Sequence, residues 1–241
     1  MALKRDRFHH LLPDEALEGK EAFIVGAGGI GGYLAVLLAK MGLPKITVVD
    51  FDDVEEVNVA TQVHSDKYLG WRKVEAVRDM VYDINRECVL TALDGKFEDV
   101  MLLGEEYAVV VTALDSLPVR KQVVKAWLGA GSKGLLVDPR MALEVCEVNL
   151  FEGADVETKE FRRYYAALDD TNPEALPCGA KAVAYTGSFA ANLSAAQIRR
   201  WMVGYEVPYW IAADVGCGRM ESDWFEGESY VPDLLPLVEV A

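Results

Sequence analysis

Glycines that could cradle a polyphosphate stand between an apolar segment and the first helical pattern of the chain. Gly26, Gly28, Gly29 and Gly31 follow the apolar residues 22–25, and apolar side chains then recur at helical spacing. Glycine lacks a Cβ and tolerates positive φ, so phosphate oxygens can reach the backbone N–H groups at the positive end of that helix. The pattern predicts a nucleotide-phosphate site, but it serves NAD and FAD proteins equally well. Glycines needed only for close packing of the strand on the helix are the alternative.

An acid ends the next apolar segment. Residues 46–50 read Ile-Thr-Val-Val-Asp, a run typical of a strand buried in a parallel sheet. In a Rossmann-type unit a carboxylate about 20 residues beyond the glycines accepts hydrogen bonds from the ribose hydroxyls. Asp50 is therefore predicted to bind the ribose of a nucleotide.

The first 140 residues, which include the glycine run and Asp50, alternate between strand and helix patterns. The apolar runs that predict strands occupy residues 22–25, 46–50, 88–91, 107–111 and 135–138. Such alternation is typical of an α/β fold, so we expect a Rossmann-like, doubly wound, mostly parallel sheet.

Beyond residue 140 the pattern changes. We expect a strand with one solvated face at 143–150, a long crossover loop at about 152–182, a helix at 184–201 and a strand at 209–214. These elements form a β/helix extension of the sheet.

The change of pattern also divides the chain. We expect an N-terminal arm over residues 1–20, a nucleotide-binding domain over residues 21–140, and a C-terminal extension of the same domain over residues 141–241. The arm precedes the first strand and is expected to be free to reach elsewhere.

Composition narrows the class of protein. The 241 residues carry 24 basic and 39 acidic side chains, and the net charge of −15 repels nucleic acid and anionic membranes at long range. No apolar run is long enough to cross a bilayer, and residues 1–10 lack the apolar core of a signal peptide. The four cysteines form no C-x-x-C pair, which argues against a disulfide framework and a thiolate zinc site. We expect a soluble cytoplasmic protein that has reduced thiols and no structural metal, and that binds neither membrane nor nucleic acid.

Four spaced motifs together resemble the superfamily of ThiF, MoeB and the ubiquitin-activating enzymes. They are the glycine run, an acid-rich stretch at 49–55 that leads into a polar stretch at 58–62, residues 70–73, and Asp115. The similarity covers about residues 20–140. It implies ATP- and Mg2+-dependent adenylylation of the C-terminal carboxylate of a protein or peptide, and it selects ATP over NAD.

The resemblance assigns the charged roles. Lys73, at a predicted helix start, matches a cation that contacts the phosphates. Asp115 matches the acid that holds Mg2+, an ion that needs only one or two carboxylates beside phosphate oxygens and water. Asp50 matches the ribose-binding acid, and Asp52 matches a second acid beside the nucleotide. A solvated lysine and a helix N-cap are the alternatives for Lys73 and Asp115.

Two amides and one missing cation complete the comparison. Asn58 and Gln62 match polar contacts to ATP, with ordinary loop polarity as the alternative. Thr61 stands where many relatives carry an arginine, so another cation must serve the phosphates. In relatives an N-terminal arginine comes across from the second subunit of a dimer, and we therefore select Arg7 and expect a homodimer. The other candidates are Arg5, Arg72, Arg120 and Arg140.

Cys178 lies at the end of the predicted crossover loop, where the resemblance is looser. Some relatives place near there a cysteine that accepts the activated carboxyl as a thioester or persulfide. A thiol close to a helix N-terminus has a lowered pKa, which favours attack by the thiolate. A buried cysteine that only packs is the alternative.

The other cysteines and the histidines are given no chemical role. Cys88, Cys146 and Cys217 are expected in the core, and His9, His10 and His64 have no spacing that suggests a metal site or a triad.

The implied partner is a ubiquitin-like or sulfur-carrier protein that ends in glycine. Three other functions remain open. The first is an adenylyltransferase that acts on a peptide or small substrate without a catalytic cysteine. The second is a NAD-dependent oxidoreductase, although no proton donor stands out in the second half of the chain. The third is a nucleotide-binding scaffold without activity, which Thr61 favours.

Overall fold

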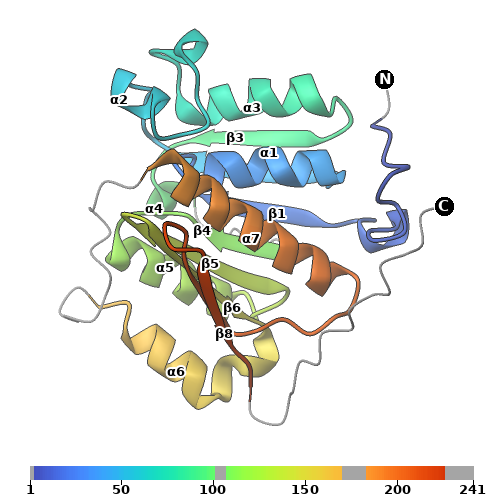
Figure 1. The fold of residues 1–241 in the computed structure, drawn as a ribbon, viewed down its shortest axis with the longest axis vertical. Coiled ribbons are helices and arrows are strands. Elements are labelled where there is room, and N and C mark those ends of the chain that lie inside the picture. The colour runs from blue at the N-terminus through green and yellow to red at the C-terminus, as the bar shows by residue number, and fades with distance from the viewer. Residues whose placement is uncertain (1–2, 101–106, 170–182, 226–241) are drawn as a thin grey trace.

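The computed structural model describes residues 3–100, 107–169 and 183–225, and one eight-stranded sheet runs through them. The strands follow the spatial order β3-β2-β1-β4-β5-β6-β7-β8, with helices on both faces (Figure 1). Their bounds are β1 Glu21–Val25, β2 Lys45–Asp50, β3 Val89–Asp94, β4 Val109–Thr112, β5 Leu135–Ala142, β6 Val145–Phe151, β7 Trp210–Asp214 and β8 Arg219–Asp223.

The parallel half of the sheet creates a switch point at its carboxyl edge. β1 pairs in parallel with β2 on one side and with β4 on the other, and β3 and β5 extend this half outward. The chain winds outward in opposite directions from β1 and β4, so the loops that follow these two strands separate. Open α/β sheets bind their ligands in the crevice at such a point.

Helices cover the two faces and form two separate cores. On one face α1 (Gly31–Met41), α3 (Lys73–Ile84) and α7 (Ala184–Met202) pack through residues such as Leu34 and Ile198. On the other face α5 (Leu117–Gly129) and α6 (Lys159–Ala166) pack through aromatic residues such as Trp127 and Phe161. With both faces covered, β4 is buried along its whole length, as its apolar sequence predicts. The short elements are α2 Glu56–Val59, α4 Phe97–Val100 and the 3-10 helices Asp14–Ala16, Asp66–Tyr68 and Gly153–Glu157.

The predicted fold class is confirmed. The antiparallel extension is longer than expected, because β6, β7 and β8 pair successively beyond β5. β8 was not predicted, since its side chains are exposed throughout and show no apolar alternation. The predicted crossover loop is also wrong in its first half, where the 3-10 helix Gly153–Glu157 and α6 have formed.

The N-terminal segment packs on its own chain. Leu12 and Leu17 are 0% and 4% exposed and belong to the α1 core, which contradicts the expectation of a free arm. Arg5 donates to the backbone oxygens of Leu12 and Met41 at 2.9 and 3.3 Å, so the segment is tied to the end of α1.

Two of the three cysteines in the described part lie in the core, as predicted. Cys88 and Cys146 are buried, and burial raises the pKa of each thiol to about 11. The prediction for Cys217 is wrong, because this residue is exposed in the turn before β8. None of the described helices combines the length and apolarity needed to cross a bilayer.

Candidate active site

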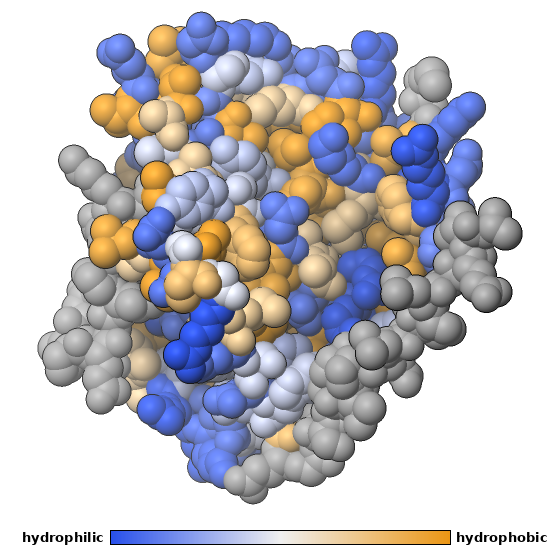
Figure 2. Space-filling view, viewed as in Figure 1, coloured by the Kyte–Doolittle hydropathy of each residue, from blue (hydrophilic) through white to orange (hydrophobic). Residues whose placement is uncertain are grey.

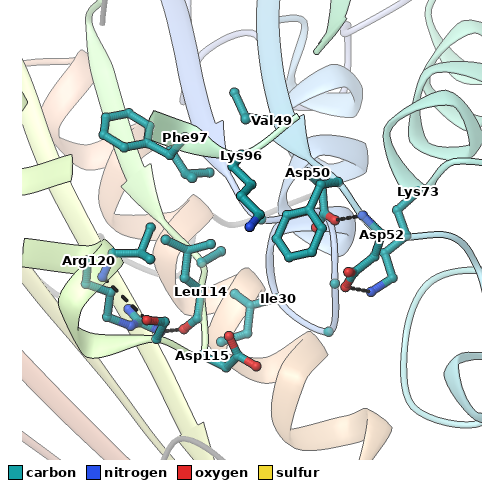
Figure 3. A pocket seen from close by; sticks show the side chains of 18 of the residues that line it. Ile30, Val49, Asp50, Asp52, Lys73, Lys96, Phe97, Leu114, Asp115 and Arg120 are labelled. Atoms are coloured by element: carbon teal, nitrogen blue, oxygen red, sulfur yellow. Dashed lines mark hydrogen bonds and ion pairs between the residues drawn. The ribbon is translucent and has the colours of Figure 1, made fainter. Parts of the chain in front are cut away.

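A cavity of about 520 Å³ opens at the carboxyl edge of the parallel strands. Each of β1, β2, β3 and β4 contributes the residues that end or follow it, and β5 contributes two residues near its own carboxyl end (Figure 3). The cavity therefore lies at the switch point between β1 and β4.

The glycine loop, residues 26–32, is packed too closely for larger side chains. Gly26 has a φ of +102°, and a Cβ there would lie 2.2 Å from the backbone oxygen of Ala113. A Cβ on Gly31 would lie 1.9 Å from the backbone oxygen of Gly26. The loop thus turns sharply against the end of β4, which leaves its outer backbone open to the cavity.

Gly31→Ala is expected to destabilise the protein by about 1–3 kcal/mol or more and to weaken nucleotide binding, because the added methyl group displaces the loop backbone. Thermal unfolding and calorimetric titration with ATP measure the two effects. Gly129→Ala is the matched control, since a Cβ on Gly129 meets nothing within 4 Å. A Gly31 variant with the melting temperature and ATP affinity of the control would contradict this account of the loop.

Asp50 holds the glycine loop as well as facing the cavity. Its Oδ2 accepts from the N–H of Ala27 at 2.6 Å, and its Oδ1 accepts from the N–H of Asp52 at 2.8 Å. Burial raises the pKa of Asp50, although these two N–H donors act in the opposite direction. Each carboxylate oxygen keeps further lone pairs, so ribose binding by Asp50 is compatible with the geometry and stays a prediction.

His64 closes the loop from the other side. This buried histidine, to which the sequence assigned no role, has its Nε2 3.0 Å from the backbone oxygen of Ala27. Burial lowers its pKa, so the neutral ring donates through Nε2 to that oxygen. Ala27 is therefore bound through both its N–H and its C=O.

Lys73 and Asp52 meet at one wall of the cavity. The ammonium of Lys73 lies 2.7 Å from Oδ2 of Asp52, and the backbone N–H of Lys73 donates to the backbone oxygen of Asp52 at 2.9 Å. The lysine side chain is 8% exposed, and the aspartate side chain is 48% exposed. Both residues line the cavity, as Figure 3 shows. The alternative that Lys73 is only a solvated lysine on a helix face therefore does not hold.

Asp115 and Gln62 also face the cavity, from other directions. Asp115 lies in the loop between β4 and α5, and Ser116 rather than Asp115 caps α5. Gln62 lies beside Gly28, and its Oε1 is buried without a hydrogen-bond partner among the described residues. An unsatisfied amide oxygen at a cavity wall fits a site that is completed by a polar ligand.

Two predicted residues, Asn58 and Arg7, do not line the cavity of the described chain, and a third, Cys178, is not described. Asn58 uses its Oδ1 to accept from the N–H of Glu55 at 2.9 Å, which closes the capping box of α2. Arg7 is exposed on the N-terminal segment and does not line the cavity of its own chain. Cys178 lies outside the described residues. The roles of all three stay predictions.

Two of the alternative arginines lie at the base of the cavity. Arg120 and Arg140 line it and are 2% and 6% exposed. Both pair with Asp138, which is 0% exposed. Arg72 instead pairs with Asp53 and Asp94 outside the cavity lining.

Sequence reasoning missed Lys96 and Phe51. Both line the cavity, and Figure 3 shows Lys96 there. The ammonium of Lys96 lies 5.7 Å from the ring centroid of Phe51. The sequence feature that could have identified Lys96 is its position immediately after Gly95, where β3 ends at the same sheet edge. The exposed aromatic ring of Phe51 lies next to Asp50 in the sequence and offers a surface on which a flat base can stack.

The cavity is locally richer in positive charge than the chain as a whole. Its lining includes four basic side chains against four acidic ones, whereas the chain carries a net charge of −15. The basic residues are Lys73, Lys96, Arg120 and Arg140, and the acidic ones are Asp50, Asp52, Glu98 and Asp115. Such a concentration of cations suits an anionic ligand.

Comparison with solved structures supports the same architecture. Escherichia coli MccB, in a structure determined with ATP, superposes with a TM-score of 0.69 at 21% identity and covers 87% of this chain and 64% of that chain. PaaA gives a TM-score of 0.67 at 16% identity and covers 87% of this chain and 74% of that chain. At these identities the likeness concerns the fold alone.

Sequence comparison finds relatives with named activities. The chain is 36% identical over 112 residues to the molybdopterin-synthase adenylyltransferase of Escherichia coli strain K12, which is 45% of each protein. It is 32% identical over 120 residues to the tRNA threonylcarbamoyladenosine dehydratase of Bacillus subtilis, or 47% of this chain and 46% of that protein. The adenylyltransferase and sulfurtransferase MOCS3-1 of Zea mays is 34% identical over 124 residues, or 48% of this chain and 26% of that protein. The chain therefore matches between about a quarter and a half of the length of these relatives.

A family model decides the classification that the spaced motifs predicted. The model described as the ThiF family matches residues 8–213, which include the strands β1 to β6 and all but the last residue of β7. The chain therefore belongs to the ThiF family.

Proposed function

We propose that this chain uses ATP to adenylylate the C-terminal carboxylate of a protein or peptide. The observation that carries the proposal is the arrangement of Lys73, Asp115 and the glycine loop around one cavity at the switch point of the sheet. These groups come from three separate loops, and together they offer a cation, an acid and open backbone N–H groups. Adenylyltransferases among the sequence relatives point to the same reaction.

The reaction joins two anions, so the site must neutralise charge and align the reactants. An oxygen of the substrate carboxylate attacks the α-phosphorus of ATP, the bond to the bridging oxygen breaks, and pyrophosphate leaves with that electron pair. Lys73 would release Asp52 and turn its ammonium to the phosphates, over a distance that a flexible lysine side chain covers. Asp50 and Gln62 would hold the nucleoside side of the substrate.

The residues at the cavity also fit a magnesium ion bound with ATP. Asp115 is the carboxylate that would hold it, since Mg2+ takes one or two carboxylates together with phosphate oxygens and water. When bound, the ion supplies positive charge that stabilises the phosphates during displacement. Within the described residues Asp115 belongs to no group of three or more histidine, cysteine, aspartate or glutamate side chains that could hold a metal ion by themselves.

The proposed substrate class is a ubiquitin-like or sulfur-carrier protein with a C-terminal glycine. A glycine tail can enter a narrow passage without a side-chain clash, and the molybdopterin-synthase and MOCS3 relatives favour a carrier protein over a metabolite. The net charge of −15 disfavours tRNA, on which the dehydratase relative acts by its name. We further propose a homodimer in which Arg7 of one subunit serves the cavity of the other.

Exchange of labelled pyrophosphate into ATP tests the proposal. The protein is incubated with ATP, Mg2+ and a small carrier protein ending in Gly-Gly, and the same carrier with an amidated C-terminus serves as control. Exchange that depends on the free carboxylate is expected. Saturable NADH binding without ATP binding would instead indicate an oxidoreductase, and ATP binding without exchange for carrier or peptide would indicate a scaffold.

Intact-mass measurement in the same reaction separates adenylylation from thioester transfer. A thioester at Cys178 would add the mass of the carrier to the chain and disappear with excess thiol. Loss of the adduct in Cys178→Ser, with exchange retained, is the result expected of an acceptor cysteine. Exchange without any adduct in the wild-type protein would leave adenylylation as the complete reaction.

A further inference from the structure

A buried ionic cluster lies directly beneath the cavity. Asp138, in the middle of β5, is 0% exposed, and both of its oxygens are bound by arginines. Arg120 of α5 binds Oδ1, and Arg140 binds Oδ2 through Nε at 3.0 Å and Nη2 at 2.7 Å. The hydroxyl of Thr112, the last residue of β4, also donates to Oδ1 at 2.5 Å. The cluster therefore joins β4, β5 and α5 at the base of the site.

Arg120 links this cluster to the loop that carries Asp115. Its guanidinium donates to the backbone oxygen of Thr112 at 2.5 Å and to the backbone oxygen of Leu114. These two carbonyls belong to the segment that leads from β4 into Asp115 (Figure 3). Arg120 thus anchors the two carbonyls that precede Asp115, on either side of Ala113, and Asp138 binds the guanidinium that makes these contacts.

The buried positive charge of Arg120 would be unfavourable without Asp138. It lies in the first turn of α5, where the helix dipole is positive, and Arg140 adds a second buried cation nearby. Burial alone would raise the pKa of Asp138, but Arg120 and Arg140 outweigh it and hold the pKa below its usual value. Asp138 therefore remains an anion and offsets the two positive charges.

We propose that Asp138 and Arg120 are positioning residues that fix the β4–α5 loop so that Asp115 is aimed into the cavity. This inference rests on the proposed function, because it takes Asp115 as the residue that holds Mg2+. Asp138 and Arg120 would act through Asp115 rather than on the substrate. The described hydrogen bonds that Arg120 donates go to the chain itself, namely to Thr112, Leu114, Pro139 and Asp138. Its remaining nitrogen, Nε, is buried and has no partner within the described chain.

Arg140 has a different place in the cluster. It binds Asp138 on the side away from α5, and its guanidinium also faces Glu147 at 3.3 Å and the ring of Tyr164 at 5.7 Å. It makes no described hydrogen bond to the β4–α5 loop. The loop therefore depends on Arg120 and Asp138, whereas Arg140 contributes by orienting the carboxylate.

The test is a Mg2+ titration of pyrophosphate exchange with the Gly-Gly carrier at fixed ATP. Asp138→Asn keeps the shape of the side chain and removes its charge. It is expected to raise the half-saturating Mg2+ concentration or lower the exchange rate by about 10–100-fold, the loss typical when an outer partner of a metal ligand is removed. Its ATP affinity in EDTA should be unchanged or higher, because the base of the cavity loses a negative charge. Arg120→Met should act in the same direction, and Arg120→Lys should restore part of the loss.

Controls separate loop positioning from general destabilisation. Asn85→Ala removes another buried polar side chain, which donates to Ala39 at 3.2 Å between α3 and α1, away from the cavity lining. It should lower the melting temperature and leave the Mg2+ dependence unchanged. Thr112→Val removes the hydroxyl contacts with Asp138 at 2.5 Å and with Arg120 at 3.4 Å and keeps the carbonyl, so it should fold and show a smaller shift in the same direction. Folded Asp138→Asn and Thr112→Val proteins with wild-type Mg2+ curves would overturn the proposal, as would an equal shift in Asn85→Ala.

Hydrogen exchange without any substrate keeps this inference distinct from the proposed function. The backbone amides of residues 112–117 should exchange faster in Asp138→Asn than in the wild type and remain unchanged in Asn85→Ala. Wild-type protein that shows no pyrophosphate exchange would refute the proposed function and leave this measurement valid. Unchanged amide exchange in Asp138→Asn would refute the positioning role.

Discussion

Lys73→Ala is expected to lower the rate of carrier-dependent pyrophosphate exchange by about 10²–10³-fold, the cost typical of removing a preorganised charge from a transition state. The lysine is the cation at the cavity wall that is bound by a single, half-exposed carboxylate, so it can exchange that partner for a phosphate. Its removal leaves the half-exposed Asp52 in contact with water, but it also removes the packing of a side chain that is 8% exposed, so some loss of stability is expected beside the loss of rate. Initial rates at saturating ATP, together with thermal unfolding, measure both quantities.

Lys67→Ala is the matched control for this prediction. Lys67 makes an equivalent ion pair, with Asp79 at 2.8 Å, but it lies outside the cavity lining. Its variant should keep wild-type exchange. Full exchange in Lys73→Ala would remove this lysine from the mechanism and with it the principal support for the proposed site.

Asp115→Asn is expected to lower exchange by about 10²-fold or more, because the variant loses the carboxylate proposed for Mg2+ while keeping nearly the same shape. Part of the activity should return at high Mg2+ concentration, since an amide oxygen still binds the ion weakly. The measurement is exchange as a function of Mg2+ concentration.

Asp169→Asn serves as the control for Asp115→Asn. Asp169 pairs with Lys121 on the outer face of α5 at 2.6 Å and does not line the cavity. Wild-type exchange and Mg2+ dependence are expected for this variant. An Asp115→Asn protein that behaves in the same way would leave the metal without its proposed ligand.

The order of elements and most of the cavity could be predicted because local pattern determines them. Parallel strands covered on both faces must be apolar throughout, and their carboxyl ends must meet at one edge, so the glycine loop and Asp50 were expected to come together. The role of Asp115 required the family resemblance, because an acid before a helix is equally typical of an N-cap. Lys73 and Gln62 required the family resemblance, since a lysine or glutamine in a loop carries little signal of its own. α6 could have been found from Phe161 and Tyr164, which recur at helical spacing inside an otherwise polar stretch.

The remaining features depend on contacts between segments far apart in the sequence. Asp138 and Arg120 are 18 positions apart and meet only because β4 and β5 are neighbours. The contact of His64 with Ala27 spans 37 positions and has no local signature. β8 is polar and exposed along its length, so only its pairing with β7 defines it as a strand.

The hydrogen bonds of Asp50 and His64 to Ala27 affect the conformational entropy that the loop loses when a nucleotide binds. The N–H and the C=O of Ala27 belong to two successive peptide groups of the loop, so both groups are held in place, and these contacts need no ligand. Little conformational entropy is therefore lost when phosphates arrive, and more of the interaction energy appears as affinity. The groups that would change conformation when the nucleotide binds are then the long side chains of Lys73 and Lys96, rather than the backbone of the loop.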